Sequence, residues 1–183
     1  YDHWASLGNV GWSYADVLPL FKATENYEPA DGVALSSTEA AYHGSGGPLN
    51  VAQRSSSNPL SEKFLECARL AGHAPTADFN GAQQEGSGMY RAYLKGGERC
   101  SNARAFLHEA MARANLTVIT QAHATRVLFE GKTAVGVRYL RAGKYAEVRA
   151  AREVVLAAGA VGSPHLLLLS GIGPAQELRA AGV

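Results

Sequence analysis

The stretch REVVLAAGAVGSPHLLLLSGIG, residues 152–173, constrains the fold more than any other part of the chain. Its run over residues 153–158, apolar after Glu153, is typical of a strand that is covered on both faces. Ser163 followed by Pro164 predicts the start of a helix, with serine as the N-cap and proline in the first helical position. A buried strand, a small-residue turn and a helix together indicate part of an open α/β sheet.

Three further runs in the second half of the chain predict a β-meander. TRVLFE, AVGVRYL and AEVRA alternate polar and apolar residues, and the turns GKT and AGK separate them. LTVIT, residues 116–120, comes before them as a second short buried strand. We therefore expect a mixed α+β or α/β fold, in which a three-stranded antiparallel meander interrupts a partial Rossmann-like sheet.

The first half predicts helices and a long irregular segment. Ser13 with Asp16 forms a capping pattern before a helical period, which Pro19 is expected to split into a turn and a short helix. Residues 29–48 are rich in Gly, Ser and Pro without a period, which favours a lid or an extended segment. Asn58-Pro59 predicts a helix that ends at Gly72.

Charge and cysteine content exclude several classes of protein. The 17 Lys and Arg residues against 16 Asp and Glu give a net charge of +1, without the basic patch of a nucleic-acid binder. The longest apolar run, residues 166–169, is far shorter than the ~20 residues that span a bilayer. Cys67 and Cys100 are expected to be small buried residues in a reducing compartment. Without a signal peptide in view, the expected location is cytoplasmic.

The usual catalytic and cofactor motifs are missing. Three partial glycine patterns lack the last glycine of a dinucleotide fingerprint, because Leu49, Arg91 and Gln176 stand in its place. The absence of that fingerprint also argues against a nicotinamide-linked reductase. The chain has no nucleophile elbow, and its six histidines show no i, i+4 pairing. We therefore assign no catalytic residue and no metal ligand.

The run over residues 159–173 resembles a signature of the glucose-methanol-choline (GMC) oxidoreductase family, in the choline or alcohol dehydrogenase type. Ten specified positions match: Gly159-Ala160, Ser163-Pro164, Leu166-Leu167 and Ser170-Gly171-Ile172-Gly173. YDHWASLGNVGWSYADVLPLF, YHGSGGPLNV, DFNGAQQEGSGMY, GERCSNARAFL and NLTVIT are also similar to the middle of a family member.

The resemblance implies an FAD enzyme that oxidises an alcohol by hydride transfer to the flavin. It places the backbone of Ala124 against the adenine, and it implies that the small residues Ala158 and Gly159 let the adenosine half approach. Neither the family's pyrophosphate loop nor its catalytic histidine is present. We therefore expect a central piece of a larger enzyme that is inactive and free of FAD when isolated.

The same resemblance divides the chain into three parts. Residues 1–48 would form a connecting lid, residues 49–114 part of a substrate-binding domain, and residues 115–183 part of an FAD-binding domain. Strand edges left open in the last part would favour self-association. The alternative is a non-catalytic binding or scaffolding module that keeps the fold without flavin. The identity of the alcohol, the electron acceptor and the choice between oxidase and dehydrogenase stay open.

Overall fold

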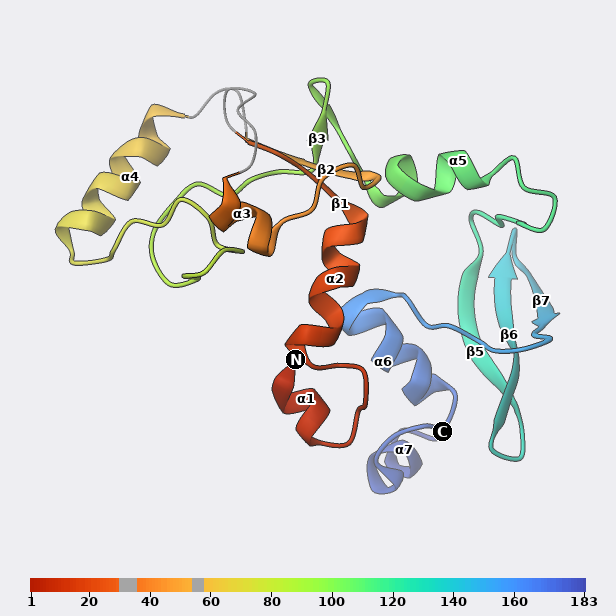
Figure 1. Cartoon of the computed structure of the whole chain (residues 1–183). Helices are drawn as coiled ribbons and strands as arrows, with labels where there is room; N and C mark the ends of the chain where they lie inside the picture. The colour runs from red at the N-terminus through yellow and green to blue at the C-terminus, as the bar shows by residue number, and fades with distance from the viewer. Residues whose placement is uncertain (30–35, 54–57) are drawn as a thin grey trace. The chain divides into compact units, whose positions relative to one another are not determined.

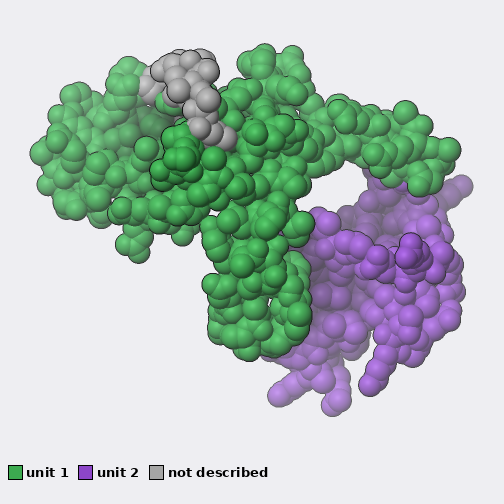
Figure 2. Space-filling model, in the orientation of Figure 1, with its two compact units in different colours: residues 1–116 green, residues 117–183 purple. Residues whose placement is uncertain are grey.

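The computed structural model describes residues 1–29, 36–53 and 58–183. They form two compact units, residues 1–116 and 117–183, coloured separately in Figure 2. The first unit contains α1 (Asp2–Ser6), α2 (Tyr14–Thr24), β1 (Glu25–Glu28), α3 (Ser37–Tyr42), β2 (Leu49–Ala52), α4 (Pro59–Leu70), β3 (Leu94–Lys95), β4 (Glu98–Arg99), a π-helical turn (Ala103–Leu107) and α5 (His108–Ala110). The second contains β5 (His123–Glu130), β6 (Thr133–Arg141), β7 (Lys144–Arg149), α6 (Gly159–Leu169) and α7 (Ala175–Ala180).

Helix α2 begins where the sequence predicts. The hydroxyl of Ser13 accepts a hydrogen bond from the Asp16 backbone at 3.2 Å, and Asp16 accepts one from the Ser13 backbone at 3.1 Å. These hydrogen bonds lower the pKa of Asp16, the Ser13 side chain contributing most. The predicted break at Pro19 is wrong, because α2 continues through it to Thr24. Proline removes one helical hydrogen bond, and the capped helix tolerates that loss.

Buried amides join the strands of the first unit. β1 and β2 pair in parallel, with Asn26 opposite Asn50. The amide of Asn26 donates to the Asn50 side chain at 2.5 Å, and the amide of Asn50 donates to the Leu94 carbonyl, also at 2.5 Å. Asn50 is almost fully buried, so these partners satisfy polar atoms that water cannot reach.

The predicted helix after Asn58 is confirmed, and one expectation about cysteine is not. The Asn58 side chain caps α4 by accepting from the Leu60 backbone at 2.9 Å, and Gly72 follows the helix at φ +93°. Cys100 is buried, as expected, whereas Cys67 on α4 is exposed. The expectation for Cys67 is wrong because α4 has no buried residue at all, so its apolar stripe lacks a core to face.

The second unit contains the predicted meander. β5, β6 and β7 form an antiparallel sheet in that order, with glycines at positive φ in both connecting turns, Gly131 and Gly143. Figure 1 shows the three strands beside one another. The mixed helix and sheet class and the three-stranded antiparallel sheet are therefore confirmed.

The two apolar runs that flank the meander are not strands. Residues 116–120 and 153–158 are assigned to neither helix nor strand. A strand needs a hydrogen-bonded neighbour. Within the described ranges, no backbone group of another strand pairs with either run. The pattern identified segments suited to a buried sheet, but it could not supply their partners.

Helix α6 starts a turn earlier than predicted. Gly159 is its first residue, and Ser163 and Pro164 lie inside it. The Ser163 hydroxyl accepts a hydrogen bond from the backbone N–H of Ala158 at 2.9 Å. Ser163 therefore provides a partner for an N–H at the start of α6, although it lies inside the helix itself. The cap-plus-proline rule therefore found the right helix and the wrong first residue.

Ser170 ties the end of α6 to the sheet. Its buried hydroxyl accepts from the Val127 backbone in β5 at 2.8 Å and donates to the Leu166 carbonyl at 2.5 Å. We expect Ser170→Ala to destabilise the second unit by about 1–3 kcal/mol, because the Val127 N–H loses its partner in a buried place. Urea unfolding measures this loss. Ser163→Ala should reduce the free energy of unfolding less, because the Ser163 hydroxyl is less buried than that of Ser170. Equal losses in the two variants would contradict the role assigned to the Ser170 hydroxyl.

Candidate functional site

Ala158 and Gly159 lie at the start of α6 and face open space. Both are exposed, and Gly159 has φ +83°. A Cβ atom built at Gly159 meets no other atom within 4 Å. The position of a side chain at Gly159 is therefore not covered by the chain's own residues, whereas the Ala158 side chain lies beside Gly162. The backbone at Gly159 can thus be approached without a steric obstacle.

Ala124 lies near the beginning of β5, in the same unit. It is exposed and pairs with Tyr139 of β6, and the register shifts between Ala124 and Arg126. This shift leaves Thr125 in a bulge, from which its hydroxyl donates to the Arg138 carbonyl at 3.2 Å. β5 is the strand that α6 contacts through Ser170. Ser170 follows the last residue of α6, whereas Ala158 and Gly159 lie at the opposite end of that helix. The contact with β5 therefore does not by itself bring Ala158 and Gly159 next to Ala124.

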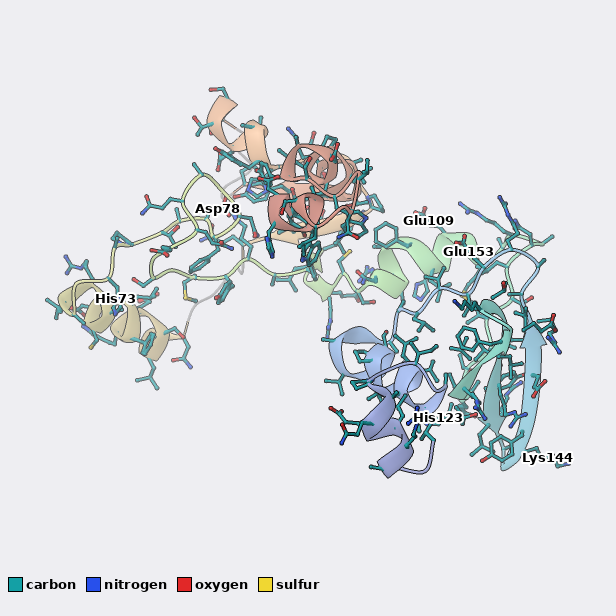
Figure 3. The ribbon with its side chains drawn as sticks, turned by 90° about the horizontal axis from the view of Figure 1, so that it is seen from below. His73, Asp78, Glu109, His123, Lys144 and Glu153 are labelled. Carbon is teal, nitrogen blue, oxygen red and sulfur yellow. The ribbon has the colours of Figure 1, made fainter. Side chains whose placement is uncertain are left out.

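A buried histidine cluster in the first unit was missed by the sequence reasoning. Nδ1 of His43 lies 3.0 Å from a carboxylate oxygen of Glu25, and Nε2 lies 2.7 Å from one of Asp78. The ring of His43 is buried, with the residue only 4% exposed, whereas the two carboxylates remain partly exposed. Asp78 lies on irregular chain after α4, apart from His73 at the end of that helix (Figure 3). The partners are 18 and 35 residues from His43, so no local spacing could have revealed them.

Aromatic and cationic groups complete this cluster. The ring of Tyr27 stacks on His43 with centroids 3.9 Å apart, and the guanidinium of Arg91 lies 4.2 Å from the Tyr27 centroid. Burial raises the pKa of Tyr27, an effect that Arg91 opposes and the nearby carboxylates strengthen. The phenol therefore stays neutral at physiological pH and acts as a stacking platform.

A cleft of about 750 Å³ in the first unit borders this cluster. Glu25, His43 and Asp78 contribute to its wall, together with the stacked rings of Phe79 and Tyr90, whose centroids are 4.6 Å apart. Its size is within the range of small-molecule sites. Both ring nitrogens of His43 are already engaged, so the ring has no free nitrogen with which to act as a base. Among the described residues, no group of three His, Cys, Asp or Glu is arranged to hold a metal ion.

No helix in the described part of the chain is both long and apolar enough to cross a membrane.

Comparisons with known proteins give a consistent result. The family described as GMC oxidoreductase matches residues 1–181. An alcohol dehydrogenase [acceptor] of Pseudomonas putida is 42% identical over 185 residues, which cover 100% of this chain and 32% of that protein. The mitochondrial choline dehydrogenase of Mus musculus is 41% identical over 179 residues, 98% of this chain and 29% of that protein. The chain thus spans about a third of the length of these relatives.

Solved structures support the same fold. Pyridoxine 4-oxidase from Mesorbium loti superposes with a TM-score of 0.80 at 32% identity, over 100% of this chain and 35% of that one. An FAD-dependent oxidoreductase from Chaetomium thermophilum gives a TM-score of 0.81 at 29% identity, over 100% of this chain and 33% of that one.

Proposed function

The chain belongs to the GMC oxidoreductase family, which matches residues 1–181, and we propose that the protein it is part of oxidises a primary alcohol with FAD. The observation that carries this proposal is the continuous match over nearly all of the chain. The alcohol and choline dehydrogenases among its relatives support the class of substrate. An alcohol would become an aldehyde, its hydride passing to the flavin and its hydroxyl proton to a base outside these residues.

The three predicted site residues of this chain would help to bind FAD and would not transfer protons. Ala158 and Gly159, both exposed at the start of α6, would leave room for the adenosine half of FAD. The backbone of Ala124 would face the adenine, and such a contact tolerates the small side chain found there. None of these residues carries a titratable group, so none is assigned a catalytic role.

Residues 115–183 would contribute to flavin binding, and residues 49–114 would contribute to the substrate-binding side. The cleft beside His43 is lined both by residues of this second part and by residues of the part before it, 1–48. Residues 1–48 would form the connecting lid, six of which, 30–35, lie outside the described residues. The 183-residue chain alone would be inactive, free of flavin and prone to self-association through unpaired backbone. A cytoplasmic location stays part of the proposal.

Activity with a panel of alcohols tests this function. The protein is expressed from the complete open reading frame and supplied with an artificial electron acceptor. We expect turnover with at least one primary alcohol. Comparison of choline with uncharged aliphatic and aromatic alcohols then defines the substrate, and comparison of oxygen with the artificial acceptor separates oxidase from dehydrogenase. A flavin-free protein that turns over none of them would support the binding or scaffolding module instead.

A further inference from the structure

We propose that the apolar stripe of α4 packs, in the complete protein, against an apolar face of a further segment of the same polypeptide, outside residues 1–183. The stripe consists of Leu60, Phe64, Cys67 and Ala71, which recur at helical spacing. This inference rests on the proposal that the chain is a piece of a longer protein. It does not depend on flavin binding or on alcohol oxidation.

The stripe is open in the described residues. Leu60 is 77% exposed and Phe64 is 73% exposed, and Cys67 and Ala71 are exposed as well. No other helix or strand that the structure describes packs extensively on α4. An amphipathic helix directs such a stripe towards a core, because most of its stability comes from packing that face. The open stripe therefore indicates a partner that is not among the described residues.

The contacts that α4 does make lie on a different side of the helix. Its half-buried residues are Ser61, Leu65 and Ala68, each of which follows a stripe residue by one position. One position corresponds to roughly a quarter of a turn. The described residues therefore partly cover one flank of α4 and leave the neighbouring stripe uncovered.

The polar side of α4 argues against a membrane or a nucleic acid as the partner. It carries two acidic and two basic residues, Glu62, Lys63, Glu66 and Arg69, so its charges balance. Helices that lie on anionic membranes are rich in Lys and Arg on this side, and nucleic acids attract a basic surface. An apolar protein surface is therefore the partner that fits the stripe.

The length of the relatives favours a segment of the same polypeptide over a second copy of the protein. The chain spans about a third of the length of the relatives named above. The remaining part of such a protein is long enough to cover one face of a helix of 12 residues. A tethered segment also packs without the loss of translational and rotational entropy that a second copy pays.

Thiol labelling of the complete protein tests the proposal, with Cys67 as the reporter on the stripe. The folded protein is treated with a maleimide, and the label is measured by mass spectrometry on the tryptic peptide of residues 64–69. Each rate is divided by the rate of the same thiol in urea. We expect Cys67 to react at least about 100-fold more slowly in the folded protein than in urea.

The double variant Cys67→Ser with Glu66→Cys is the matched control. It moves the thiol of this peptide by one residue, to an exposed position on the polar side of α4. The thiol at position 66 should react at nearly the same rate in the folded protein as in urea. Equal normalised rates at positions 66 and 67, whether fast or slow, would overturn the proposal.

Dilution and solution mass separate the same polypeptide from a second copy. Protection of Cys67 that is unchanged on dilution supports the proposal, and protection that is lost on dilution would overturn it. Phe64→Asp addresses a dimer too tight to dilute. Its mass in solution should equal that of wild type, and half the wild-type mass would also overturn the proposal. Neither readout needs flavin, so a protein that is inactive towards alcohols still gives a result.

Discussion

Replacing Ala158 by leucine is expected to weaken FAD binding by the whole protein at least about tenfold while the second unit stays folded. Ala158 is exposed at the start of α6, so the larger side chain has space in the protein itself. Under the proposed function, it would occupy the open space beside Gly159 that the adenosine half of FAD would need. Flavin content per chain and titration of the apoprotein with FAD measure the change.

Ala175→Leu is the matched control for this variant. Ala175 is also an exposed alanine at the start of a helix in the second unit, α7. The control should bind FAD as the wild-type protein does. Full flavin content in Ala158→Leu, or equal losses in both variants, would show that Ala158 does not face the cofactor.

Gly44→Ala is expected to destabilise the first unit by about 3 kcal/mol. A Cβ at this position would overlap the carbonyl oxygen of Lys22 and lie 2.6 Å from its carbonyl carbon. The backbone at Gly44 cannot move away without breaking hydrogen bonds, because its N–H donates to the Glu25 carboxylate at 3.0 Å and its carbonyl accepts from the Tyr27 backbone at 3.0 Å. Denaturant unfolding of wild type and variant gives the difference in free energy.

Gly46→Ala separates overlap from backbone strain. Gly46 has φ +79° with open space around it, so alanine there should cost about 1–2 kcal/mol from conformation alone. The larger loss is expected at Gly44, although its φ does not require glycine. A smaller loss of unfolding free energy for Gly44→Ala than for Gly46→Ala would contradict this expectation, because it would show that the backbone at Lys22 moves aside at little cost.

Local signals predicted two helix starts and the meander correctly, but they misplaced the start of α6 and predicted a break at Pro19 that does not occur. Ser13 with Asp16 and Asn58 with Pro59 identified the starts of α2 and α4, because a capping side chain reaches only two or three residues along the chain. Alternation of polar and apolar residues between glycine-containing turns identified β5, β6 and β7, because each strand pairs with the next one along the chain. The motif over residues 159–173 identified the family, because ten specified positions match within this short stretch.

Features that depend on distant partners were not predictable. The runs over residues 116–120 and 153–158 have the composition of strands, but pairing is decided by neighbours that the runs do not contain. His43 depends on two carboxylates far along the chain. Ala124, Ala158 and Gly159 stay predictions as flavin contacts, because small side chains reveal accessible space and not its occupant.

Anaerobic mixing of the FAD-loaded whole protein with an alcohol from the panel tests the proposed chemistry most directly. We predict that the flavin absorbance bleaches and that one aldehyde forms for each flavin reduced. Flavin that stays oxidised with every alcohol, yet is reduced by dithionite, would contradict alcohol oxidation as the function of this protein.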